Sequence, residues 1–173
     1  MKSANLILQK EKRYALKTIK NKSSEISNLE NANDSLHETI DNAAILKASS
    51  VEAQAYKLKS DKKRFTTRAK RANAIDVCIR LSENPLTEKG NKDIYIQIVS
   101  PQGNVVADKG EIVFGENSLI YSKKEIFNFD NENLEICAAI IADEEDQPFK
   151  KGYYFVNVFH DNVNLGSTSI QLK

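Results

Sequence analysis

The sequence has 173 residues, of which 40% are hydrophobic and 28% charged, and it contains no tryptophan. It has no apolar run near 18 residues and its N-terminal end is dotted with Lys and Arg, so we expect neither a membrane-spanning helix nor a signal peptide. Residues 1–75 hold 16 basic and 8 acidic residues, a balance of +8, whereas residues 76–173 hold 9 and 16, a balance of −7. This asymmetry predicts two parts of different character.

The first part, residues 1–45, is predicted to form a helical coiled-coil stalk. It contains no Gly and no Pro, the residues that most often interrupt helices. From residue 26 to residue 43 a heptad repeat places Ile at position a and Leu at position d, with a single Asn at a. This combination is typical of parallel two-stranded coiled coils. The predicted coiled-coil seam consists of Ile26, Leu29, Asn33, Leu36, Ile40 and Ala43.

Two arrangements would bury this seam. A helix of about 45 residues would be roughly 65 Å long, and it would not be stable in water with its apolar stripe exposed. We favour self-association into a homodimer over packing against the second part of the same chain. Upstream of residue 26 the heptad weakens, with Lys12, Ala15 and Lys22 at seam positions. The regular seam therefore belongs to the end of a stalk.

The second part, residues 46–173, is predicted to be all β. Apolar and polar residues alternate in short runs, most clearly over residues 75–81 and 134–141. Turn sequences such as Asn84-Pro85 and Pro101–Asn104 separate these runs, and no helical segment lies between them. The pattern predicts an antiparallel β-sandwich of immunoglobulin or fibronectin type with about seven to nine strands.

The two cysteines, Cys78 and Cys137, each lie in the middle of a predicted strand, 59 residues apart. That separation resembles the inter-sheet disulfide of immunoglobulin domains. Each cysteine is nevertheless on the opposite face of its strand from apolar neighbours such as Val77 and Ile136, so both are expected to face outward. If the two strands are neighbours, a disulfide could still form across them and contribute on the order of 4 kcal/mol in an oxidising compartment. Two half-buried thiols are the alternative, and both remain open.

A basic segment covers residues 57–71 and holds eight cations against one acid, Asp61. As a functional surface it would meet phosphates or an acidic partner. As a structural element it would be a solvated edge strand whose charges discourage aggregation, which we favour, or it would meet acidic groups of its own domain. Only Phe65 is interleaved, which is too little for a base-stacking platform. The eight cations are Lys57, Lys59, Lys62, Lys63, Arg64, Arg68, Lys70 and Arg71.

Other groups with chemical potential give weaker signals. His37 and His160 lie far apart, and neither has neighbours at metal-ligand spacing. The acidic run Asp143–Asp146 lacks the ordered Asp-x-Asp-x-Asp-Gly spacing of a calcium loop, so we expect a solvated loop. The sequence has no phosphate-binding Gly-rich loop and no nucleophile elbow. We therefore expect no metal, no cofactor and no enzymatic activity.

Three stretches together carry a family resemblance: Arg71–Cys78, Asn84–Ile98 and Lys151–Thr168. They resemble the C-terminal domain of uncharacterised bacterial proteins often labelled "chromosome partitioning protein ParA", and the likeness covers roughly residues 25–173. A partitioning ATPase needs a P-loop with Gly-Lys-Thr/Ser, which this sequence lacks. The resemblance therefore carries over no catalytic residue.

The resemblance does imply an architecture and a location. Family members look like an N-terminal membrane anchor followed by a long coiled coil and this β-domain, with cysteines at the positions of Cys78 and Cys137. This implies an envelope-facing, membrane-tethered scaffold and favours the oxidised cysteine pair. The present chain lacks the anchor and most of the coil, so we expect a periplasmic location if a longer precursor exists and a cytoplasmic one otherwise.

Two hypotheses on function follow. In the first, the helix dimerises a non-enzymatic structural protein whose β-sandwich meets an unidentified protein partner, in the cell envelope. In the second, the chain is a cytoplasmic factor that binds nucleic acid through residues 57–71, in which case phosphate contacts would make binding steeply dependent on salt. We favour the first, because no stacking platform accompanies the basic segment.

Overall fold

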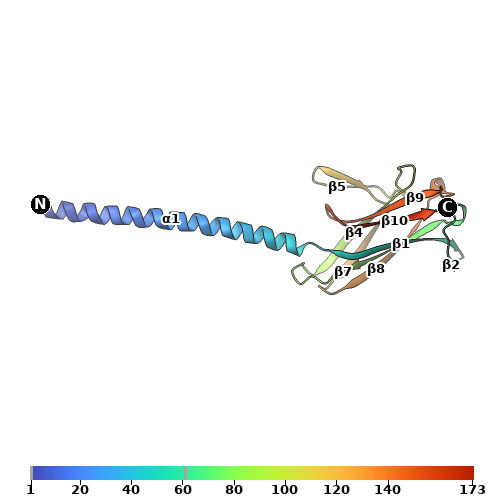
Figure 1. The fold of residues 1–173 in the computed structure, drawn as a ribbon, viewed down its shortest axis with the longest axis horizontal. Helices are drawn as coiled ribbons and strands as arrows, with labels where there is room; N and C mark the ends of the chain where they lie inside the picture. Colours follow the sequence, from blue (N-terminus) through green and yellow to red (C-terminus); the bar gives the residue numbers. More distant parts are fainter. Residues whose placement is uncertain (1, 61) are drawn as a thin grey trace. The chain divides into compact units, whose positions relative to one another are not determined.

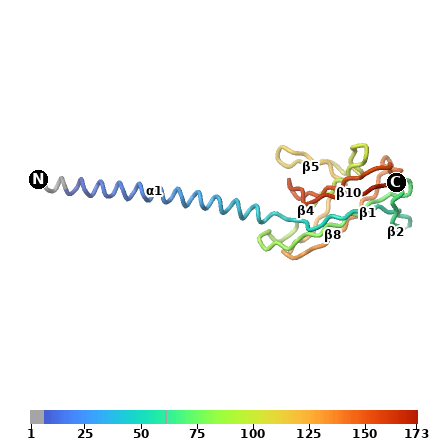
Figure 2. The backbone as a smooth tube through the Cα atoms, viewed as in Figure 1, coloured from blue at the N-terminus to red at the C-terminus, as the bar shows by residue number. Residues whose placement is uncertain are grey.

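The computed structural model describes residues 2–60 and 62–173, with side chains described from residue 7 onward. The chain divides into two compact units, Met1–Ala43 and Ala44–Lys173. The first unit is a single helix, α1 (Lys2–Ala44), whose 43 residues contain neither Gly nor Pro. The second unit is built of antiparallel strands (Figures 1 and 2). The predicted order of a helix followed by antiparallel β-structure is confirmed.

The described residues form ten strands, more than the seven to nine predicted. Three of the ten are short: β2 joins the first sheet by pairing with only the end of β1, and β5 and β6 pair with each other in a separate two-stranded ribbon. The strands are β1 (Ala48–Lys59), β2 (Lys62–Phe65), β3 (Ala74–Leu81), β4 (Gly90–Val99), β5 (Glu111–Phe114), β6 (Asn117–Ile120), β7 (Lys123–Phe129), β8 (Leu134–Ile141), β9 (Gly152–His160) and β10 (Val163–Leu172).

Two four-stranded sheets face each other across one core. The first has the order β2-β1-β3-β8 and the second the order β10-β9-β4-β7. If the strands are lettered as in immunoglobulin domains, β1, β3 and β8 occupy positions A, B and E, while β10, β9, β4 and β7 occupy G, F, C and C′. The order of strands therefore defines an immunoglobulin-like β-sandwich.

Side-chain alternation decides which residues fill the core. Successive side chains of a strand point to opposite faces, so every second residue of β3 is directed inward. Ile75, Val77 and Ile79 are 0% exposed, and they meet equally buried residues of β4 and β9 from the other sheet. Burying such side chains is the main favourable contribution to folding. The facing residues are Ile94, Ile96, Ile98, Tyr154, Val156 and Val158.

A buried tyrosine fixes the corner between β8 and β9. The Tyr154 hydroxyl donates to the backbone oxygen of Lys150 at 3.0 Å and accepts from the backbone N–H of Lys150 at 2.9 Å. Its ring packs against Phe149, with the ring centroids 5.3 Å apart. A tyrosine that ties the corner before strand F back to the upstream backbone is a hallmark of immunoglobulin-like sandwiches. Burial also raises the pKa of the Tyr154 hydroxyl above its ordinary value.

The β5–β6 ribbon packs on the second sheet through aromatic rings. Tyr95 of β4 contacts Phe114 and Tyr121 edge to face, with ring centroids 5.7 Å and 5.2 Å apart. The Gln97 side-chain amide donates to the backbone oxygen of Ile120 at 2.9 Å. Gly115 adopts the positive φ of 61° that the tight turn between β5 and β6 requires. The ribbon is therefore held against the sheet at both ends, by Phe114 next to its turn and by Ile120 and Tyr121 at its base.

Candidate functional site

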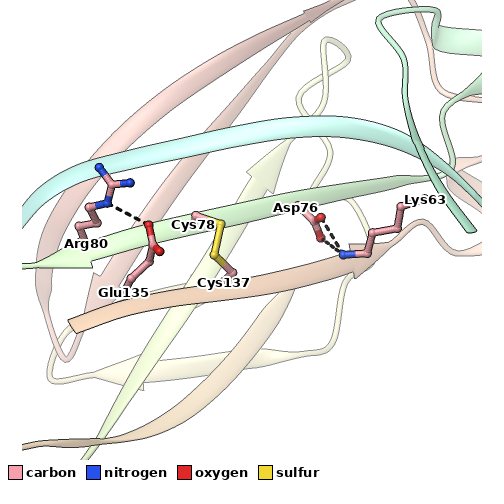
Figure 3. The surroundings of a disulfide bond; sticks show 6 residues. All are labelled: Lys63, Asp76, Cys78, Arg80, Glu135 and Cys137. Carbon is pink, nitrogen blue, oxygen red and sulfur yellow. Dashed lines mark hydrogen bonds and ion pairs between the residues drawn. A yellow bond between two sulfur atoms is a disulfide. The ribbon is translucent and has the colours of Figure 1, made fainter. Parts of the chain in front are cut away.

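A disulfide joins Cys78 of β3 to Cys137 of β8 (Figure 3). The two residues are directly opposite each other in the β3–β8 ladder. Because Val77 and Ile79 point into the core, Cys78 lies on the outer face of the first sheet. Cys78 is half-buried and Cys137 is exposed. The bond is thus a cross-strand disulfide within one sheet rather than the inter-sheet disulfide of antibody domains.

Ion pairs flank the disulfide along the same face (Figure 3). Arg80 follows Cys78 by two residues in β3, and its Nε donates to a Glu135 carboxylate oxygen at 2.9 Å. Asp76 precedes Cys78 by two residues in β3, and its carboxylate lies 2.8 Å from the Lys63 ammonium. This hydrogen bond raises the pKa of Lys63. These pairs are largely solvated, so each contributes little to stability. The disulfide is the one covalent feature in this row of polar contacts.

The Lys63 ammonium also lies over the Tyr56 ring, 4.8 Å from its centroid. Burial raises the pKa of the Tyr56 hydroxyl, and Asp76 adds to the shift. One cation of the basic segment therefore belongs to a local cluster with an acidic residue of its own domain. Lys63 thus differs from the four cations on the other face of the hairpin in that it has an anionic partner, Asp76.

Four cations share the opposite face of the β1–β2 hairpin. The register places Lys57 directly across from Arg64, and Lys59 directly across from Lys62. We call these four residues the cationic face; all four are exposed. Asp61, the acid weighed with this segment in the sequence, lies outside the described residues. Phe65, 68% exposed, pairs with Tyr56 on the other side of the hairpin.

The remaining cations of the segment follow the hairpin. Arg68 precedes a short 3₁₀ helix, η1 (Ala69–Arg71), in which Lys70 and Arg71 are exposed while Ala69 is fully buried. The Ala69 backbone N–H donates to the backbone oxygen of Lys173 at 2.9 Å, which anchors the turn to the end of the chain. The basic segment is therefore a hairpin followed by an anchored turn, and its eight cations do not form a single strip.

The predicted coiled-coil seam lies on α1. Ile26, Leu29, Leu36 and Ile40 are between 50% and 63% exposed, and Asn33 is exposed as well. Ala43, the last seam residue, is half-buried. In the single chain, the apolar side chains at heptad spacing on α1 are thus exposed to solvent.

The other groups singled out in the sequence serve local structure. The His160 Nδ1 lies 2.7 Å from the backbone oxygen of Asp93, and His37 is an exposed residue of α1. In the acidic loop, Asp143 pairs with the Lys109 ammonium at 3.0 Å, and an Asp146 carboxylate oxygen accepts the Ala107 backbone N–H at 2.6 Å. Across residues 2–60 and 62–173, no three His, Cys, Asp or Glu residues gather as a metal site would require.

Sequence reasoning missed the pairing inside the cationic face. In the structure β1 ends at Lys59 and β2 begins at Lys62, which leaves a two-residue connection. Two-residue hairpin turns fix the register of the strands that they join. A hairpin with this turn places Lys57 across from Arg64. The sequence Ser60-Asp61 is not one of the pairs, such as Asn-Gly or Asp-Gly, that mark a two-residue hairpin turn, so the register could not be derived from it.

The fold and these features define an immunoglobulin-like β-sandwich with an outward-facing disulfide and a cationic hairpin. The chain belongs to the family described as "Domain of unknown function (DUF8428)", whose model matches residues 49–173. No curated protein matches the chain. Among the described residues, no helix is both long enough and apolar enough to cross a membrane.

Solved structures offer distant fold likenesses. One is the alkylpurine DNA glycosylase AlkC of Pseudomonas fluorescens, bound to DNA containing an abasic site analogue, at 16% identity and a TM-score of 0.42. That match covers 75% of this chain but only 31% of the glycosylase. Another is an immunoglobulin-like protein of Pseudomonas aeruginosa, at 13% identity and a TM-score of 0.39, covering 76% of this chain and 98% of that one.

Proposed function

We propose that the protein is a non-enzymatic scaffold that dimerises through α1 and presents its β-sandwich to a protein partner in the cell envelope. The observation that carries this proposal is the exposure of four large apolar seam residues, Ile26, Leu29, Leu36 and Ile40, each at least half open to solvent. A single helix with such a stripe is marginal in water, and a second helix would bury it.

The seam residues favour a parallel dimer. Ile26 and Ile40 are at position a, and Leu29 and Leu36 are at position d, the distribution that favours two parallel strands. Asn33 occupies the a position between them. In a parallel dimer the two Asn33 side chains would meet and hydrogen-bond, which penalises other registers. The two β-sandwiches would then leave the stalk at the same end.

The disulfide supports a location outside the reducing cytosol. Disulfides such as Cys78–Cys137 form and persist in oxidising compartments, including the bacterial periplasm. The resemblance to coiled-coil proteins labelled as partitioning proteins gives the same location. Kinship with that group, and a tether supplied by a longer precursor, are part of this proposal.

Two double variants of the whole chain test the dimer. Leu29→Asn with Leu36→Asn places polar groups in the seam, and we expect a monomer by sedimentation equilibrium where the unsubstituted chain is a dimer. Ser27→Asn with Ser35→Asn is the matched control, because it introduces two Asn residues into the same stretch of the helix at exposed positions outside the seam. An unsubstituted chain that is monomeric at every concentration, or a seam variant that remains dimeric, contradicts the proposal.

The location is tested separately by the thiol state in intact cells. Free thiols are alkylated before lysis, and labelling is then read by mass spectrometry. We expect Cys78 and Cys137 to escape labelling unless a reductant is added first. Full labelling of both residues without a reductant would place the protein in a reducing compartment.

A further inference from the structure

The cationic face of the β1–β2 hairpin is electrostatically unfavourable in the isolated protein. Lys57 stands directly across from Arg64, and Lys59 directly across from Lys62. Like charges directly opposite each other across two strands are destabilising. No ion pair is found for any of these four cations among the described residues, whereas Lys63 on the other side of the hairpin pairs with Asp76. The face therefore carries concentrated positive charge that an external anion would neutralise.

The hairpin is positioned rather than loose. The ladder between β1 and β3 ends at the Tyr56–Ala74 pair, so the following residues of β1 extend beyond it. There the side chain of Asn73 takes the place of a strand: its amide oxygen accepts the Leu58 N–H at 2.7 Å, and its amide nitrogen donates to the Leu58 oxygen at 3.0 Å. The four cations are thus presented on a short extended ribbon.

The composition of the face indicates recognition by charge alone. Its side chains are three ammonium groups and one guanidinium, while Phe65 lies on the opposite side of the hairpin. Proteins that bind single-stranded nucleic acid stack bases on aromatic rings, and readers of duplex sequence contact base edges, commonly with Arg, Asn or Gln. The cationic face carries no ring and no amide side chain, and its single arginine, Arg64, is accompanied by three lysines, whose ammonium groups bind phosphates as point charges. It matches a surface of closely spaced phosphates better than a base.

The disulfide narrows the identity of that phosphate surface. The Cys78–Cys137 disulfide favours an oxidising compartment, whereas chromosomal DNA and RNA reside in the reducing cytosol. A bilayer with anionic headgroups is a phosphate surface that an envelope compartment contains. Clusters of Lys and Arg bind such surfaces, at about 1 kcal/mol for each cation near the surface, which is about fivefold in partitioning.

We propose that the cationic face, Lys57, Lys59, Lys62 and Arg64, binds the headgroup phosphates of an anionic lipid bilayer. This inference rests on the oxidising location in the proposed function, but it does not require the helix to dimerise. It assigns the β-sandwich a second contact, distinct from any protein partner: the cationic face of the β1–β2 hairpin lies against a membrane surface.

Vesicle sedimentation with the whole chain tests the inference. We expect binding to vesicles of phosphatidylglycerol mixed with phosphatidylcholine, none to phosphatidylcholine alone, and a decrease with added salt as screening grows. Lys57→Gln with Arg64→Gln, and separately Lys59→Gln with Lys62→Gln, should each weaken binding about 25-fold, because each of the two cations contributes about fivefold. Both variants remove a like-charge pair, so they are expected to fold at least as well as the unsubstituted chain.

Two controls separate the face from net charge. Lys89→Gln with Lys92→Gln removes the same charge at the start of β4. Side chains just before β4, those of Asn84 and Thr87, donate to backbone oxygens of the residues that precede β1, so this site lies at the other end of β1 from the hairpin. Lys63→Gln removes one charge from the other side of the same hairpin. Both controls should change vesicle binding less than about threefold, less than the effect of one cation at the surface. Circular dichroism checks the folding of every variant.

Three results would overturn the inference. The first is an absence of binding to the anionic vesicles at low salt. The second is a loss of binding in the Lys89 and Lys92 control as large as in the hairpin variants, which would show that net charge alone is responsible. The third is binding to a DNA duplex that depends on Lys57 and Arg64 without binding to vesicles, which would assign the face to nucleic acid.

Discussion

Apolar residues recur periodically in both the helix and the β-sandwich, but they are exposed in the helix and buried in the β-sandwich. In α1, Ile26 and Leu29 recur at heptad spacing and are more than half exposed. In β3, Val77 and Ile79 alternate with polar residues and are 0% exposed, because β4 and β9 of the same chain cover them. Periodicity therefore shows which face of an element needs burial. It does not show whether the same chain or another molecule supplies the cover.

The largest expected effect tests the self-sufficiency of the β-sandwich. Phe129 of β7 is 0% exposed, and Phe129→Ala should lower the free energy of unfolding by about 3–5 kcal/mol through lost burial and a cavity. Urea unfolding followed by near-UV circular dichroism measures the loss. Val113→Ala is the control, since Val113 is exposed and its truncation should cost less than about 0.5 kcal/mol. Similar losses in both variants would contradict a closed core around Phe129.

The next effect concerns the covalent link on the sandwich. Cys78→Ala with Cys137→Ala frees a loop that the disulfide closes over a sequence separation of 59, and the chain-entropy model gives a loss of about 4 kcal/mol or less. The unsubstituted protein, measured in urea with a reductant, should show the same loss. A midpoint of unfolding that reduction leaves unchanged would show that the disulfide does not stabilise the domain.

Dilution distinguishes the two regions directly. If a second copy covers the seam of α1, a hundredfold dilution lowers the apparent stability of the helix by about 2.7 kcal/mol, while the β-sandwich unfolds independently of concentration. Far-UV circular dichroism of the helical band and near-UV circular dichroism of the aromatic residues follow the two transitions. A helical transition that does not move with concentration would show that no second copy covers the seam of α1.

A smaller effect is expected at the β8–β9 corner. Tyr154→Phe removes the hydroxyl that hydrogen-bonds the backbone N–H and oxygen of Lys150, and it should lower the free energy of unfolding by about 1–2 kcal/mol. Because burial raises the pKa of Tyr154, the hydroxyl stabilises the fold below the unfolded pKa near 10, and that contribution disappears as the pH rises through the higher folded pKa. Thermal unfolding between neutral and alkaline pH should show less alkaline loss in the variant. Tyr56, whose pKa burial also raises, contributes to the remaining alkaline loss, as do Lys63 and Lys124, whose pKa values hydrogen bonds to Asp76 and Asp93 raise.

The smallest effect concerns the exposed surface. Asp76→Asn removes the carboxylate that raises the pKa of Lys63, so the pKa of Lys63 should fall toward its ordinary value in an NMR titration. The thermal midpoint should stay nearly constant, because exposed ion pairs contribute little. A large drop in the midpoint would show that the polar row beside the disulfide contributes substantially to stability.

Faces could be predicted from the sequence, whereas pairings between distant strands could not. The alternation around Ile75 and Val77 identifies the buried side of β3 because strand side chains alternate strictly. The pairing of Cys78 with Cys137 depends on β3 and β8 becoming neighbours, which no local pattern encodes. The corner made by Tyr154 likewise needs a backbone partner that the sequence does not mark. The seam of α1 remains a prediction.

The short connection from α1 to β1 has a mechanical consequence. Tension that arrives through the helix enters the β-sandwich at Ala48, the first residue of β1. Because β1 is hydrogen-bonded to β3 from Ala48 to Tyr56, a force along β1 stresses these backbone hydrogen bonds together, in shear. It does not break them one after another. The Cys78–Cys137 bond then passes the force from β3 to β8 without relying on hydrogen bonds. A force that enters β1 is therefore shared among β1, β3 and β8 of the first sheet.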